Sequence, residues 1–218
     1  MRTHGFQPAD MLGLAAGAVL LVGAYNRGTT ALSFVLTMTV IASFLWFLAD
    51  PNRQRVAENI SVTLLGVVYV PFLGAHVILM TGLPHGATIT ICYIGLVALN
   101  DIGAYASGVL FGKHPMAPNV SPKKSWEGTI GATALMFLLA LIVGPLLTPF
   151  KLWSSVALAG IVTVLAPLGG LASSVLKRDI DIKDCGSVLP GHGGLLDRID
   201  ALLLVAPAAY WLIRVAVF

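Results

Sequence analysis

Long apolar runs separated by short polar segments make up most of the chain. A helix needs about 20 apolar residues to cross a hydrocarbon layer roughly 30 Å thick, and no water is there to satisfy an unpaired backbone. Seven runs approach or reach this length and are predicted to be membrane-spanning helices: 9–25, 29–49, 61–82, 88–111, 129–150, 152–176 and 201–218. The pattern therefore predicts an all-α, polytopic transmembrane helical bundle that forms a single integral-membrane domain over residues 1–218.

The composition supports a membrane protein and excludes other classes. Hydrophobic residues make up 57% of the 218 positions and charged residues 11%, with a mean hydropathy of +0.88, far outside the balance of a water-soluble domain. Cys92 and Cys185 form neither a disulfide framework nor a metal-finger spacing, and nothing supports nucleic-acid binding. The first run follows Arg2 as a signal peptide would, but no small-residue cleavage site follows it, so an uncleaved span is expected.

The placement of the positive charges predicts the orientation of the bundle. If the seven runs cross the membrane in turn, ten of the 13 Lys and Arg residues lie on one side: Arg2, Arg53, Arg55, Lys113, Lys123, Lys124, Lys177, Arg178, Lys183 and Arg198. Because Lys and Arg concentrate in cytoplasmic segments, this side is predicted to be the cytoplasm, with the N-terminus inside. Two polar segments, 112–128 and 177–200, share this side, so any chemistry there would use a cytoplasmic solute.

Three acids near the start of the last run are candidate metal ligands. Asp197 and Asp200 are three residues apart, so they share one face if they are helical, and Asp184 precedes them in the polar segment. The helix dipole alone would favour carboxylates at a helix start, which is the simpler explanation. Hard oxygen ligands of this kind suit one or two Mg²⁺ ions, especially where substrate phosphates complete the coordination shell.

Glycines and bases in the same segment indicate phosphate handling. Residues 191–194, Gly-His-Gly-Gly, lead into the last run, where exposed N–H groups could bind an anion, although a simple turn between helices has the same composition. Lys177 and Arg178 end the sixth run and could equally be interfacial anchors. The convergence of bases, glycines and acids on one short segment favours phosphate handling over coincidence.

An acid in the fourth run is a further candidate. A charge within a span is costly unless it faces protein or water, so Asp101 is a functional candidate, with a helix-packing pair with Asn100 as the alternative. Gly103 and Gly108 permit close helix approach. Lys123 and Lys124 lie in the next polar segment, where contact with anionic lipid heads is the ordinary explanation.

Two patches resemble one enzyme family. Residues 174–178 read SVLKR, Lys183-Asp184 follows after four residues, and residues 190–200 read PGHGGLLDRID. This gapped, charge-rich pattern resembles the C-terminal signature of the phosphatidate cytidylyltransferase, or CDP-diacylglycerol synthase, family. Asn100-Asp101 and the segment SPKKSWEG, residues 121–128, are similar to its other cytoplasm-facing motifs. The resemblance covers about residues 60–218, and the chain is shorter than typical members, which implies one or two fewer N-terminal spans.

Two positions depart from the family pattern. Ile102 stands where a hydroxyl residue is expected, and Ser125 stands where threonine is usual. The second change is conservative because it keeps the hydroxyl, whereas the first removes a minor polar contact.

The resemblance implies a reaction of phosphatidate with CTP that gives CDP-diacylglycerol and pyrophosphate, with Mg²⁺ as cofactor, in phospholipid biosynthesis. Its implied metal ligands are Asp184, Asp197 and Asp200, in a site that could hold two ions. Its implied phosphate clamps are Lys177, Arg178, Lys183 and Arg198. Substrate contacts would come from Asn100, Asp101, Lys113, Ser121, Lys123, Lys124, Glu127, Gly191, His192, Gly193 and Gly194. A bacterial plasma membrane with the site facing the cytoplasm is implied, and homodimerisation is left open.

Two other functions are compatible with parts of this pattern. A CTP-dependent lipid kinase of the polyprenol or phytol type would use similar architecture but would transfer the γ-phosphoryl group and release CDP. An ion-coupled transporter would use Asp101 within the membrane, but it would not explain why most charged motifs gather at one face.

Overall fold

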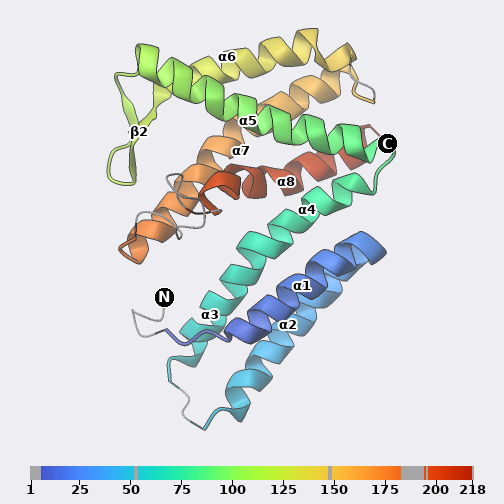
Figure 1. The fold of residues 1–218 in the computed structure, drawn as a ribbon, viewed down its shortest axis with the longest axis vertical. Coiled ribbons are helices and arrows are strands. Elements are labelled where there is room, and N and C mark those ends of the chain that lie inside the picture. The colour runs from blue at the N-terminus through green and yellow to red at the C-terminus, as the bar shows by residue number, and fades with distance from the viewer. Residues whose placement is uncertain (1–5, 52–53, 147–148, 183–193, 195, 218) are drawn as a thin grey trace. The chain divides into compact units, whose positions relative to one another are not determined.

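The protein is almost entirely helical in the computed structural model, which describes residues 6–51, 54–146, 149–182, 194 and 196–217 (Figure 1). The chain divides into two compact units, Met1–Gly82 and Leu83–Phe218. The expectation of a single integral-membrane domain stays a prediction.

The first unit consists of α1 (Asp10–Arg27), α2 (Thr29–Ala49), α3 (Val56–Val67), the π-helical turn η2 (Val68–Phe72) and α4 (Leu73–Thr81). Helix α1 packs against α2 and α4. Pro71 lies within η2, where the wider turn accommodates a residue without an N–H. A Cβ at Gly17 would lie 3.1 Å from Pro71 Cγ, so the absence of a side chain there lets α1 approach this turn.

The second unit consists of α5 (Gly86–Phe111), β1 (Pro115–Ala117), β2 (Ser121–Ser125), α6 (Trp126–Ile142), the 3₁₀ turn η3 (Gly144–Leu146), α7 (Leu152–Asp179) and α8 (Leu196–Ala216). Helix α5 packs against α6, and α7 packs against both α6 and α8. Strands β1 and β2 pair antiparallel, with Pro115 opposite Ser125 and Ala117 opposite Ser121. This hairpin joins the end of α5 to the start of α6 (Figure 1).

Small residues allow α5 and α6 to lie close together. A Cβ at Gly128 would lie 2.6 Å from Ala104 O, and one at Gly131 would lie 2.1 Å from Ser107 Oγ. On the α5 side, a Cβ at Gly103 would lie 2.9 Å from Leu135 Cδ2. The prediction that small residues of the fourth run permit close helix approach is therefore confirmed.

The prediction of an all-α, polytopic membrane bundle is confirmed. Among the described residues, six helical stretches are long and apolar enough to cross a membrane: Thr29–Ala49, Val56–Thr81, Gly86–Phe111, Trp126–Leu146, Leu152–Asp179 and Leu196–Ala216. The first predicted span, 9–25, corresponds to α1, whose 18 residues include the polar ends Asp10 and Arg27; α1 is not among these six stretches. The last helix begins at Leu196 rather than at residue 201, so Asp197 and Asp200 lie within its first turns.

Candidate active site

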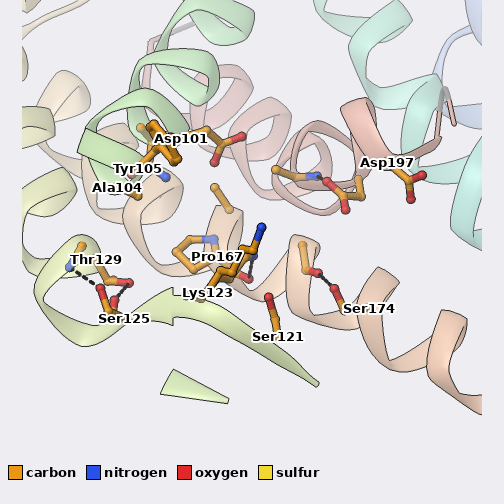
Figure 2. Close-up of a pocket in the computed structure, with 17 residues that line it drawn as sticks. Asp101, Ala104, Tyr105, Ser121, Lys123, Ser125, Thr129, Pro167, Ser174 and Asp197 are labelled. Atoms are coloured by element: carbon orange, nitrogen blue, oxygen red, sulfur yellow. Dashed lines mark hydrogen bonds between the residues drawn. The ribbon is translucent and has the colours of Figure 1, made fainter. Parts of the chain in front are cut away.

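A cavity of about 380 Å³ in the second unit gathers charged residues from distant parts of the sequence (Figure 2). Its walls come from the C-terminal half of α5, the β2 strand, the start of α6, the C-terminal half of α7 and the start of α8. Seven of the predicted site residues line it: Asn100, Asp101, Ser121, Lys123, Lys124, Asp197 and Asp200. The two patches that were singled out in the sequence therefore meet around one cavity.

Asp197 lies in the first turn of α8 and is held from two sides. Its Oδ1 accepts a hydrogen bond of 2.8 Å from Lys177 Nζ, and its Oδ2 accepts one of 3.1 Å from the Gly194 backbone N–H. Both side chains of the ion pair are only 14% exposed. An acid in the first turn of one helix and a base in the last turn of another also suit the two helix dipoles, so the pair joins α7 to α8 at the cavity.

Asp200 lies one turn further along α8. Its Oδ2 accepts a hydrogen bond from the Ser173 hydroxyl, and its Oδ1 accepts one of 2.7 Å from the Ala201 backbone N–H. Ser173 is buried in α7. No sequence pattern distinguishes Ser173 from other small residues of the span, because its contact depends on how α7 packs against α8.

Lys124 extends from β2 towards α7 and brings a positive charge among these acids. Its Nζ donates a hydrogen bond of 3.1 Å to the backbone carbonyl of Pro167. Burial lowers the pKa of Lys124, and the nearby Asp200 and Asp101 carboxylates act in the opposite direction. Lys123, the adjacent residue, lines the same cavity and is exposed.

Asp101 and Asn100 form the α5 side of the cavity, where Figure 2 shows the Asp101 carboxylate beside Tyr105 and Ala104. Asn100 is 1% exposed. Neither polar atom of its amide has a hydrogen bond of ordinary geometry within the described part of the chain. Ile102, the departure from the family pattern, is 62% exposed, and it is not a lining residue.

Glu127 holds the hairpin in place at the start of α6. Its Oε2 accepts hydrogen bonds of 3.2 Å from the backbone N–H groups of Lys113 and His114, and its Oε1 pairs with His114 Nδ1. Ser125 caps α6 by accepting a 3.2 Å hydrogen bond from the Gly128 N–H. A threonine hydroxyl could accept the same bond, which explains why Ser125 is a conservative departure.

Several predicted site residues lie outside the cavity lining. The backbone N–H of Lys113 donates a hydrogen bond to the Glu127 carboxylate, and neither residue lines the cavity. Arg178 and Arg198 are exposed and do not line it either. Lys177 and Gly194 each donate a hydrogen bond to Asp197, which lines the cavity. Lys183, Asp184, Gly191, His192 and Gly193 lie outside the described residues.

We expect the Glu127→Ala substitution to loosen the hairpin without unfolding the bundle. The amides of Lys113 and His114 lose the acceptor Glu127 Oε2, so their hydrogen–deuterium exchange should accelerate by about tenfold or more. Glu58→Ala, which removes an exposed acid from α3 in the other unit, is the control and should leave both amides unchanged. Unchanged exchange in Glu127→Ala would show that this carboxylate does not hold the hairpin.

The donor set around the cavity fits a hard divalent cation. Asp197 and Asp200 present carboxylate oxygens from one helix to one cavity, and oxygen ligands of this kind suit Mg²⁺. Among the described residues, however, no group of three or more His, Cys, Asp or Glu side chains could hold a metal ion together. The third predicted ligand, Asp184, lies outside the described residues.

The fold and the cavity define a helical integral-membrane protein with a charged cavity between a hairpin and four of its spans. Residues 2–216 match the model of the cytidylyltransferase family. The chain belongs to this family.

Individual relatives that match the chain include proteins named phosphatidate cytidylyltransferase. The chain is 38% identical over 160 residues to the phosphatidate cytidylyltransferase of Mycobacterium bovis, covering 73% of this chain and 52% of that protein. It is 36% identical over 146 residues to the phosphatidate cytidylyltransferase of Brucella suis, covering 66% and 54%. Over 180 residues it is 35% identical to the uncharacterized protein YnbB of Escherichia coli, covering 80% and 60%. The chain thus spans about half the length of the phosphatidate cytidylyltransferases that it matches.

Proposed function

We propose that the protein transfers the cytidylyl group of CTP to phosphatidate, giving CDP-diacylglycerol and pyrophosphate. The observation that carries this proposal is the single cavity that collects Asp101 from within one membrane span, Asp197 and Asp200 from the start of another, and Lys123 and Lys124 from the hairpin. Matched relatives bear the name phosphatidate cytidylyltransferase, which supports the same substrates here.

The chemistry requires positioning and charge compensation rather than a side-chain nucleophile. A phosphate oxygen of phosphatidate attacks the α-phosphorus of CTP in line. A new P–O bond forms, the bond from the α-phosphorus to the oxygen bridging to the β-phosphorus breaks, and pyrophosphate leaves with that oxygen. Lys123 and Lys124 line the cavity and would bind the phosphates. Lys177 does not line the cavity but forms an ion pair with Asp197, which does, and from there it would contact the pyrophosphate portion.

Two described acids would hold the metal. Mg²⁺ bound by Asp197 and Asp200, with Asp184, would neutralise phosphate charge and favour the departure of pyrophosphate. Before ligands bind, the Lys177 ammonium, the Ser173 hydroxyl and two backbone N–H groups satisfy these carboxylates. These hydrogen-bond donors orient the two carboxylates that would bind the metal.

The position of the site at the ends of the spans suits a reaction between a lipid and a water-soluble nucleotide. Phosphatidate and CDP-diacylglycerol can diffuse laterally to and from the cavity while CTP enters from solution. Ten of the 13 Lys and Arg residues fall on one side of the seven-span arrangement predicted from the sequence, which favours a cytoplasmic site and an inside N-terminus. The bacterial relatives support a location in the plasma membrane.

The identity of the product tests the proposal. Purified protein in detergent is incubated with phosphatidate, CTP and Mg²⁺, and the lipid fraction is analysed by mass spectrometry. We expect CDP-diacylglycerol together with pyrophosphate. With a polyprenol or another lipid alcohol as acceptor, release of CDP and a phosphorylated lipid would instead support the kinase and overturn the proposal.

A further inference from the structure

One face of α7 receives charged side chains from two other elements. Pro167, Gly170 and Ser173 are spaced three residues apart, so they lie on neighbouring turns of the helix. Lys124 reaches this face from β2, and Asp200 reaches it from α8. An ammonium group and a carboxylate that are far apart in sequence therefore lie against the same face of one helix, at the wall of the cavity.

Gly170 provides the space that the ammonium group occupies. A Cβ at this position would lie 2.3 Å from Lys124 Nζ, 3.4 Å from its Cε and 3.9 Å from Asp200 Oδ2. Lys124 Nζ also donates a hydrogen bond of 3.1 Å to the Pro167 carbonyl. The ammonium group can occupy this position because Gly170, one turn further along α7, has no side chain. Any side chain at position 170 would force the ammonium group to shift from its present position.

Ser173 fixes the carboxylate beside it. The side chain is 2% exposed, and its hydroxyl donates to Asp200 Oδ2. A serine hydroxyl has one proton to donate, and the other nearby acceptor, Gly170 O, lies at 3.4 Å. With Oδ1 bound to the Ala201 N–H, both oxygens of Asp200 are held, so the carboxylate has one defined orientation towards the cavity.

We propose that Gly170 and Ser173 are positioning residues of the site, Gly170 by leaving room for the Lys124 ammonium group and Ser173 by orienting the Asp200 carboxylate. Their importance for turnover rests on the proposed cytidylyl transfer. Small displacements of groups that hold reacting phosphates cost large factors in rate, so both contacts should matter, Gly170 acting through Lys124 and Ser173 through Asp200. Neither residue belongs to the motifs on which the family resemblance rests.

The first experiment measures the position of Lys124 without using activity. A water-soluble amine-reactive reagent is applied to the protein, and modification of Lys124 is compared with that of its exposed neighbour Lys123 by fragmentation mass spectrometry. In Gly170→Ala we expect the ratio of Lys124 to Lys123 labelling to rise about fivefold or more, because the added methyl group removes the ammonium group from its half-buried position.

Gly160→Ala is the matched control for this substitution. Gly160 lies in the same helix, and a Cβ there would meet nothing within 4 Å. The labelling ratio of this variant should equal that of the wild type. A ratio that stays unchanged in Gly170→Ala would overturn the assignment of Gly170, whatever its activity.

The second experiment tests whether Ser173 acts through its hydroxyl group or only by filling space in the helix packing. We expect Ser173→Ala to lower kcat about tenfold while the KM for phosphatidate stays within about twofold. Ser173→Thr keeps the hydroxyl and should restore most of the lost turnover. Thr163→Val removes another buried hydroxyl of α7, one that bonds to Gly160 O of its own helix, and should remain close to wild type. Wild-type kcat in Ser173→Ala would overturn the assignment of Ser173.

These readouts distinguish failure of the inference from failure of the proposed function. If Gly170→Ala exposes Lys124 to labelling but wild-type protein makes no CDP-diacylglycerol, the proposed reaction is wrong and the contact on α7 stands. If wild-type protein makes CDP-diacylglycerol but the labelling ratio and the kcat of both variants match the wild type, the reaction stands and the positioning roles are wrong.

Discussion

Asp197→Asn is expected to lower the turnover of CDP-diacylglycerol synthesis by about a thousandfold. The amide that replaces the carboxylate carries no charge, so it is a poor ligand for Mg²⁺ and no longer forms the ion pair with Lys177. Initial rates with saturating CTP and phosphatidate measure the effect, because they report kcat rather than substrate affinity.

Asp179→Asn is the matched control for this substitution. Asp179 is an exposed acid at the end of α7 and does not line the cavity. Its variant should retain turnover within about twofold of the wild type. Comparable turnover in Asp197→Asn and in the wild type would remove Asp197 from the site.

Removal of divalent metal ions should reduce turnover to the background rate. The carboxylates of Asp197 and Asp200 line the same cavity as Lys123 and Lys124, but these lysines alone cannot compensate the phosphates of CTP and phosphatidate together. Dialysis against a chelator followed by rate measurement tests the expectation, and added Mg²⁺ should restore the full rate. Chelator already saturated with Mg²⁺ is the control. Undiminished turnover in metal-free buffer would reject the metal assignment.

The sequence was sufficient to predict the helical membrane architecture and the grouping of seven residues that line the cavity. Apolar runs long enough to span a bilayer leave the backbone few alternatives to a helix, so the spans could be predicted within a few residues. The spacing of Asp197 and Asp200 predicted that both share one face of the last helix, and both line the cavity. The resemblance to the family motifs predicted that Asp101 and Lys124 belong to the same site. The spacing of apolar residues alone could not have predicted this.

The remaining features depend on tertiary packing that leaves little local signal. The hairpin of β1 and β2 is short, and the two residues before it, Lys113 and His114, donate backbone hydrogen bonds to the side chain of Glu127 at the start of the next helix. Ser173 and Gly170 look like ordinary small residues of a span, because their partners come from α8 and β2. Glu127 was predicted to contact substrate, and its oxygens instead bind the hairpin backbone; that substrate role stays a prediction.

The most direct measurement of the central claim follows the phosphorus atoms of CTP. Wild-type protein and Asp197→Asn are reconstituted in vesicles containing phosphatidate and supplied with CTP radiolabelled at either the α- or the γ-phosphorus. The account predicts that the α-label alone enters the lipid fraction, that the γ-label leaves as pyrophosphate, and that Asp197→Asn transfers neither. Transfer of the γ-label to lipid, or equal transfer of the α-label by both proteins, would contradict it.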